Sequence, residues 1–67
     1  MINYKTKNLI ACLNCITANH YEIKEDNWNY EIWINCDLYD HMIYDNENKA
    51  QDRIRRIIKS YLDSYLE

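Results

Sequence analysis

Hydrophobic residues recur at helical spacing near the N-terminus of this 67-residue chain. The stretch covers residues 6–18, and its apolar positions are Leu9, Ile10, Leu13 and Ile16. Thr6 or Asn8 can cap the start of such a helix, and Asn19 suits its end. The pattern therefore predicts a short helix with one apolar face.

A second helical pattern begins at about Asn46 and continues towards the C-terminus. Its apolar positions fall within about 140° of arc and are Ala50, Ile54, Ile57, Ile58, Tyr61, Leu62 and Tyr65. Asp45 or Asn46 can cap this helix, and the charge of Glu47 suits the positive end of its dipole. The second helix is expected to be longer and more amphipathic than the first.

Alternation with a period of two lies between the helices and predicts strands. Residues 20–25 and 30–36 alternate most clearly, and Asp26-Asn27 is a plausible hairpin turn between them. In the second strand, the inward face is predicted to carry Tyr30, Ile32, Ile34 and Cys36, and the outward face Glu31, Trp33 and Asn35. Residues 37–40 are expected to form a second turn. A short strand over 41–44 would follow, with a helix over 38–43 as the alternative.

The order of elements is α-β-β-(β)-α and predicts a single α+β domain over residues 1–67. An antiparallel meander of two or three strands would pack with the two helices. A chain of this length buries only about 60% of its unfolded surface. So small a core leaves apolar surface available, so that homodimerisation is possible.

Glycine and proline are both absent, and this excludes several classes of enzyme. The P-loop, the dinucleotide-binding fingerprint and the nucleophile elbow of serine hydrolases all depend on glycine. No other catalytic motif is present, so we expect neither an enzyme nor a cofactor. The N-terminus has no signal-peptide pattern, and no apolar run approaches the ~18 residues of a membrane span. The sequence predicts a cytoplasmic protein with reduced thiols and no membrane partner.

Three cysteines and two histidines raise the question of a zinc site. The candidate ligands are Cys12, Cys15, Cys36 and His41. The Cys12/Cys15 pair falls inside the first predicted helix and lacks the sharp glycine turn of a zinc knuckle. Buried structural cysteine is therefore the favoured interpretation, and no metal is expected.

Residues 25–47 carry seven acidic side chains, five aromatic ones and no lysine or arginine. We refer to this stretch as the acidic block. Its one-signed charge favours cationic partners and opposes direct binding of DNA. Exposed tryptophan and tyrosine between carboxylates are typical of an interface hot spot. The predicted partner-binding residues are Glu25, Asp26, Trp28, Glu31, Trp33, Asp37, Tyr39, Asp40, Asp45 and Glu47.

The second helix carries a basic stripe beside its apolar face, formed by Lys49, Arg53 and Arg56. Such a stripe can follow phosphate groups or contact an acidic patch on a protein. The alternative hypothesis is therefore a small regulatory or assembly module that contacts nucleic acid or a partner subunit through this helix.

The succession of a short helix, a meander and an Ile-rich helix resembles small phage anti-CRISPR proteins that occupy the DNA site of RNA-guided nucleases. The similarity involves residues 8–16, 21–24, 30–35, 41–45 and 48–62. In acidic members of that group, carboxylates in strand-edge loops engage the arginines that would read a short duplex motif. The resemblance implies a non-catalytic inhibitor from a phage or mobile element, acting on a host nuclease in the cytoplasm. Inhibition away from the DNA groove remains an alternative.

Overall fold

The computed structural model describes residues 1–65, which form two helices and a three-stranded sheet. The elements in chain order are α1 (Tyr4–Ile16), β1 (Tyr21–Asp26), β2 (Asn29–Ile34), β3 (Asp37–Tyr44) and α2 (Glu47–Tyr65). The sheet is an antiparallel meander with the strand order β1-β2-β3. The predicted α+β class is therefore confirmed, with three strands in the meander.

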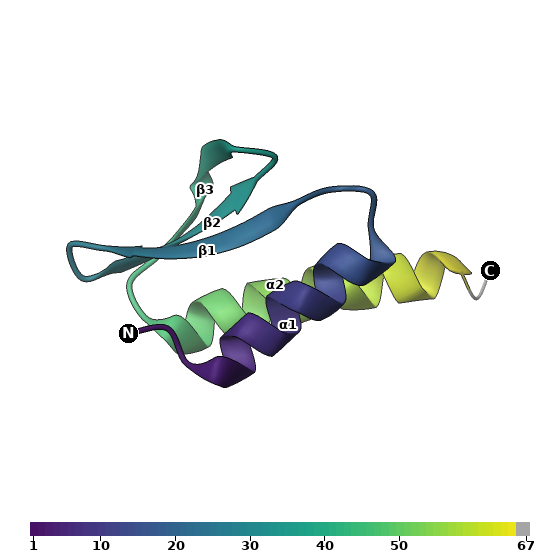
Figure 1. Ribbon diagram of the computed structural model, residues 1–67, viewed down its shortest axis with the longest axis horizontal. Coiled ribbons are helices and arrows are strands. Elements are labelled where there is room, and N and C mark those ends of the chain that lie inside the picture. The colour runs from purple at the N-terminus through teal and green to yellow at the C-terminus, as the bar shows by residue number, and fades with distance from the viewer. Residues whose placement is uncertain (66–67) are drawn as a thin grey trace.

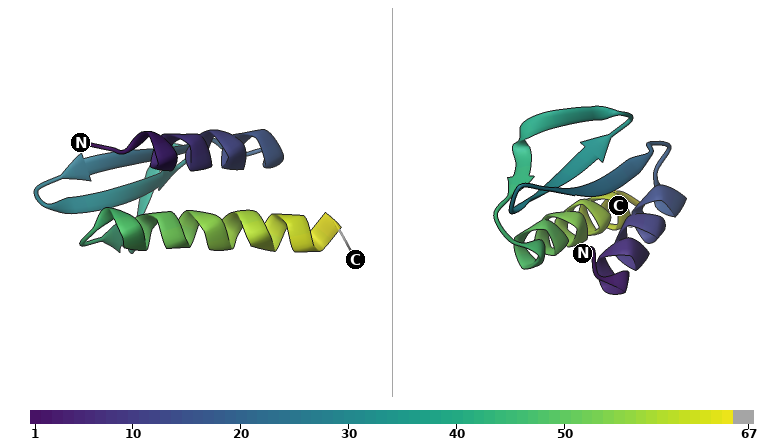
Figure 2. Two further views of the ribbon diagram at one scale, coloured as in Figure 1. Left: turned by 90° about the horizontal axis from the view of Figure 1, so that it is seen from below. Right: turned by 60° about the vertical axis from the view of Figure 1, so that its left-hand side comes forward.

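The molecule has two layers, a sheet and a pair of helices (Figure 1). The helices pack side by side and run in the same direction, and both cover the same face of the sheet (Figure 2). No helix within the described residues covers the other face. As a result, each strand has one side towards the core and one towards solvent.

The core lies between these layers, where the periodic apolar positions of the sequence meet. Its buried hydrophobic residues are Ile10, Leu13, Tyr21, Ile32, Met42, Ala50 and Ile54. Leu13 of α1, Ile32 of β2 and Ile54 of α2 are completely buried, so one residue from each of three elements anchors it. Full burial of one such side chain contributes about 1.5–3 kcal/mol.

Helix α1 begins two residues earlier than predicted because Asn3 caps it. The side chain of Asn3 accepts a hydrogen bond from the backbone N–H of Lys5 at 2.8 Å. Thr6, which was expected to cap the helix, is instead completely buried inside its first turns. At the other end, the helix stops at Ile16 with Thr17 as its C-terminal cap.

Helix α2 continues beyond the part that α1 covers (Figure 2). Its predicted apolar face is buried at Ala50 and Ile54 but open to solvent towards the end, where Tyr65 is 78% exposed. No helix among the described residues has both the length and the apolar character needed to span a bilayer.

The two hairpin turns lie one residue or more from their predicted positions. The first is formed by Asn27 and Trp28, with φ values of 44° and 71°, and not by Asp26-Asn27. The second is formed by Asn35 and Cys36, with φ values of 51° and 68°. Positive φ at both central residues is the mark of a type I′ hairpin turn, and asparagine tolerates this region better than most other residues. Asn therefore opens each turn in the absence of glycine.

Residues 37–40 belong to β3, so the prediction of a turn there was wrong, as was the alternative of a helix over 38–43. The predicted strand at 41–44 is confirmed as the second half of β3. Between the pairs Trp33–Leu38 and Glu31–Ile43, four residues of β3 lie opposite the single residue Ile32. This bulge interrupts the alternation along β3, so its sequence did not resemble a strand.

Candidate functional site

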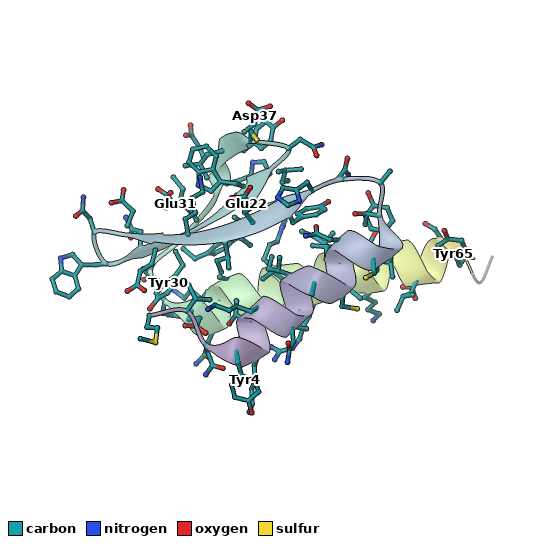
Figure 3. The ribbon with its side chains drawn as sticks, viewed as in Figure 1. Tyr4, Glu22, Tyr30, Glu31, Asp37 and Tyr65 are labelled. Atoms are coloured by element: carbon teal, nitrogen blue, oxygen red, sulfur yellow. The ribbon has the colours of Figure 1, made fainter. Side chains whose placement is uncertain are left out.

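The uncovered side of the sheet is the first candidate surface, and we call it the open face. It is formed by Glu22 and Lys24 of β1 and by Glu31 and Trp33 of β2, with Glu22 paired to Trp33 and Lys24 paired to Glu31. Glu22 and Glu31 project away from the helices, whereas Tyr30 of β2 points towards them (Figure 3). The alternation predicted for β2 is thus present from Tyr30 to Ile34.

Trp33 is held in place on the open face, on the middle strand near the second hairpin. Its indole Nε1–H donates a hydrogen bond to Glu31 Oε1 at 3.0 Å, and Lys24 Nζ lies 4.0 Å from the centre of its ring. The ammonium group therefore makes a cation–π contact with the indole. Trp33 is half-buried, and these two contacts orient its indole on the sheet.

Three carboxylates of the acidic block are engaged within the protein. Glu25 lies 2.6 Å from the N-terminal amino group, and Asp45 lies 3.0 Å from Lys49 Nζ. Glu47 accepts hydrogen bonds from the backbone N–H of Asn3 and from the side chain of Thr6. Burial, with the charges of Glu25 and Glu47, raises the pKa of Tyr30. These three carboxylates therefore already have partners within the protein.

Three other carboxylates, those of Asp26, Asp37 and Asp40, are exposed and make no ion pair or side-chain hydrogen bond with any residue from 1 to 65. Asp26 ends β1 beside the first hairpin turn, and Asp37 begins β3 after the second. These turns lie at opposite ends of β2, whose six residues span about 17 Å, since its first and last residues are five steps of ~3.3 Å apart. The predicted site residues consequently form two acidic ends with the open face between them, not one patch.

The tip of the first hairpin carries Trp28, whose side chain is 91% exposed. Its φ of 71° lies in the left-handed region, which costs a non-glycine residue about 1–2 kcal/mol. A large apolar side chain in a strained and solvated turn contributes little to stability. Such outliers are typical of residues retained for binding.

Near the second acidic end, Tyr39 is also exposed, and its ring centre lies 5.8 Å from that of His41. Both residues belong to the bulged part of β3. This arrangement adds aromatic surface to the strand that carries Asp37 and Asp40.

The predicted basic stripe of α2 forms one wall of a cleft of about 430 Å³ against β3. The cleft is lined by His41, Tyr44, Lys49, Asp52, Arg53 and Arg56. The participation of His41 and Tyr44 could not be predicted, because it depends on how the bulged strand packs beside α2. Long-range packing of this kind leaves no local signal in the sequence.

All three cysteines are exposed, so the interpretation of buried structural cysteine was wrong. Cys12 and Cys15 lie on the outer side of α1, and Cys36 lies in the second hairpin turn rather than on the inward face of β2. In the part of the chain that the structure describes, no three His, Cys, Asp or Glu residues come together in a way that could hold a metal ion.

No protein-family model matches this chain, and neither a curated protein nor a solved structure is significantly similar to it. The evidence on function therefore comes from the residues of the open face, its acidic ends and the basic cleft.

Proposed function

We propose that this protein is a non-catalytic inhibitor from a phage or mobile element that binds a host defence nuclease, in the manner of anti-CRISPR proteins. The open face and its two acidic ends would contact a basic nucleic-acid-binding site on the nuclease. The observation that carries this proposal is the preordered Trp33, which lies on an uncovered sheet between two groups of carboxylates.

The chemistry of these groups suits a site that normally holds nucleic acid. The carboxylates of Asp37 and Asp40 have no cationic partner within residues 1–65, so they are available to arginine or lysine on another protein. Trp28 offers an exposed flat apolar surface where a base would otherwise stack, and Trp33 offers the part of its indole that Lys24 does not cover. An ordered indole also loses little conformational entropy on binding, which favours affinity.

Charge reversal at Asp37 and Asp40 tests the proposal directly. Tagged wild-type protein and the variants Asp37→Lys and Asp40→Lys would capture proteins from a host lysate for quantification by mass spectrometry. Asp63→Lys is the matched control, because it makes the same change in charge on the exposed side of α2. The captured protein would then be purified and its DNA binding and cleavage measured with and without each variant.

We expect wild-type protein to capture a nucleic-acid-binding enzyme from the lysate. The Asp63→Lys variant should capture the same amount of this enzyme, whereas Asp37→Lys and Asp40→Lys should each capture at least tenfold less. The loss of one buried charge-assisted contact costs about 2–5 kcal/mol, which exceeds a tenfold change in affinity. Wild-type protein should displace DNA from this enzyme. Equal capture by all variants, or unchanged DNA binding by the captured enzyme, would disprove nucleic-acid mimicry.

A further inference from the structure

The cleft between β3 and α2 is electropositive on a protein of net negative charge. Its lining contains Lys49, Arg53 and Arg56 against the single carboxylate of Asp52, which gives +3 − 1 = +2 with His41 neutral. The whole chain carries −3. A concave site of opposite sign to the rest of the molecule concentrates anions.

Two of the three cations in this cleft have no counter-ion of their own. Lys49 Nζ lies 3.0 Å from Asp45, and Asp52 is bound by Arg55 at 3.3 Å. Neither Arg53 nor Arg56 is within ion-pair distance of a carboxylate in the part of the chain that the structure describes. Both guanidinium groups are therefore available to an external anion.

Of the two arginines, Arg53 gives the stronger evidence for an anion-binding site. It is half-buried, and its Nε atom is buried without a hydrogen-bond partner in the described residues. Burial of a charged group is costly unless an opposite charge compensates it. An anion on the outer nitrogens of Arg53 would supply that compensation.

The opposite wall of the cleft is aromatic and held in place. Tyr44 and His41 of β3 line it, and the hydroxyl of Tyr44 donates a hydrogen bond to the backbone oxygen of His41 at 3.1 Å. A volume of about 430 Å³ lies in the range of small-molecule sites, which is ~300–1,000 Å³. The cleft can thus hold one anionic group on its arginines and a flat group against its rings.

We propose that this cleft binds the phosphate group of a small phosphorylated molecule of about nucleotide size. Arginine suits phosphate because its planar fork of donors can make two parallel hydrogen bonds to the phosphate oxygens. A long nucleic-acid strand fits less well, because beyond the cleft it would pass the carboxylate of Asp45, which lies just before α2. The cleft adjoins the second acidic end, because the ring centre of His41 lies 5.8 Å from that of Tyr39. None of its lining residues belongs to the open face, so this proposal does not depend on the proposed inhibition.

The proposal can be tested by measuring ligand binding to the full chain by NMR and calorimetry at low salt. The ligands are 5′-AMP, adenosine, inorganic phosphate and a single-stranded DNA oligonucleotide. The informative variant is Arg56→Gln, since Arg56 is exposed and its loss should leave the fold intact. Lys59→Gln is the matched control, because it removes one charge from the same helix outside the cleft lining. Arg53→Gln serves as a second variant.

We expect 5′-AMP to shift the amide signals of His41, Tyr44 and Arg53, and inorganic phosphate to compete with it. Adenosine should bind at least tenfold more weakly than 5′-AMP. Arg56→Gln should weaken 5′-AMP binding about tenfold, as expected for one charge-assisted contact, and Lys59→Gln by less than about twofold.

Three results would overturn the proposal. The first is that neither 5′-AMP nor phosphate binds, and the second is that Lys59→Gln weakens binding as much as Arg56→Gln. The third is that the oligonucleotide binds through Arg53 and Arg56 while 5′-AMP does not, which would assign the cleft to a nucleic-acid strand.

Discussion

The hydroxyl of Thr6 on α1 donates a hydrogen bond to the carboxylate of Glu47 at the start of α2 and so joins the N-terminal ends of the two helices. Asn3 donates its backbone N–H to the same carboxylate oxygen at 3.1 Å. The side chain of Gln51 donates to the Thr6 hydroxyl at 2.8 Å. Because Thr6 is completely buried, this hydrogen-bond network fixes the N-terminal ends of the two parallel helices relative to each other.

Replacement of Thr6 by valine should lower the free energy of unfolding by about 1.5–3 kcal/mol. The change keeps the shape of the side chain but removes a buried hydrogen bond to a charged group. Urea denaturation followed by circular dichroism measures the effect. Thr17→Val is the matched control, since it removes a hydroxyl that bonds only to neutral backbone groups, donating to the Asn19 oxygen and accepting from the Asn19 N–H, both at 3.3 Å. Equal losses in the two variants would contradict a special role for the Thr6–Glu47 contact.

The two tryptophans should report different surroundings. Trp28 is 91% exposed, whereas Trp33 is half-buried beneath Lys24. The Trp28→Phe variant retains only Trp33, and the Trp33→Phe variant retains only Trp28. The fluorescence of Trp33 should therefore have its maximum at a shorter wavelength and be quenched less by acrylamide than that of Trp28. In urea the two variants should become alike. Identical native spectra would show that Trp33 is not ordered on the open face.

Glycine at the hairpin tips should separate stability from binding. Trp28 and Cys36 both occupy positive φ, so Trp28→Gly and Cys36→Gly should each raise the free energy of unfolding by up to about 1 kcal/mol. Under the proposed function, Trp28→Gly should also weaken capture of the partner, since it removes an exposed anchor. Cys36→Gly is its control at the other hairpin. A destabilised Trp28→Gly variant would mean that the indole supports the fold.

The fold was largely predictable because most of its core positions follow simple periods. Ile10 and Leu13 recur at helical spacing, as do Ala50 and Ile54, while Ile32 lies within strict alternation. The alternation of residues continues past the end of β2, so the predicted strand over 30–36 was too long at its C-terminal end. Cys36 follows Ile34 with the period of a strand, but Asn35 and Cys36 turn the chain.

The candidate site was less predictable, because charge patterns do not show which carboxylates have partners. Glu47 lies at the end of the acidic block, two residues after Asp45, yet Thr6, 41 residues away, engages it. The bulge likewise exposes Tyr39, Asp40 and His41 in succession, which is the pattern of a turn rather than of a strand. Contacts between distant segments decide both features.

The pair Asp45–Lys49 should make a small contribution to stability that depends on pH. Its hydrogen bond to Lys49, and then the charge of that lysine, hold the pKa of Asp45 below its usual value of 3.8. A carboxyl whose pKa is lowered on folding stabilises the protein above its unfolded pKa, and this contribution is lost as the pH falls through the folded pKa. In Lys49→Gln, the carboxyl carbon of Asp45 should therefore titrate closer to pH 3.8 by NMR, whereas in Lys59→Gln it should titrate as in wild type. Because both side chains are well exposed, about 0.5 M salt should reduce the difference. Titration of Asp45 at the same pH in wild type and Lys49→Gln would show that the pair does not form in solution.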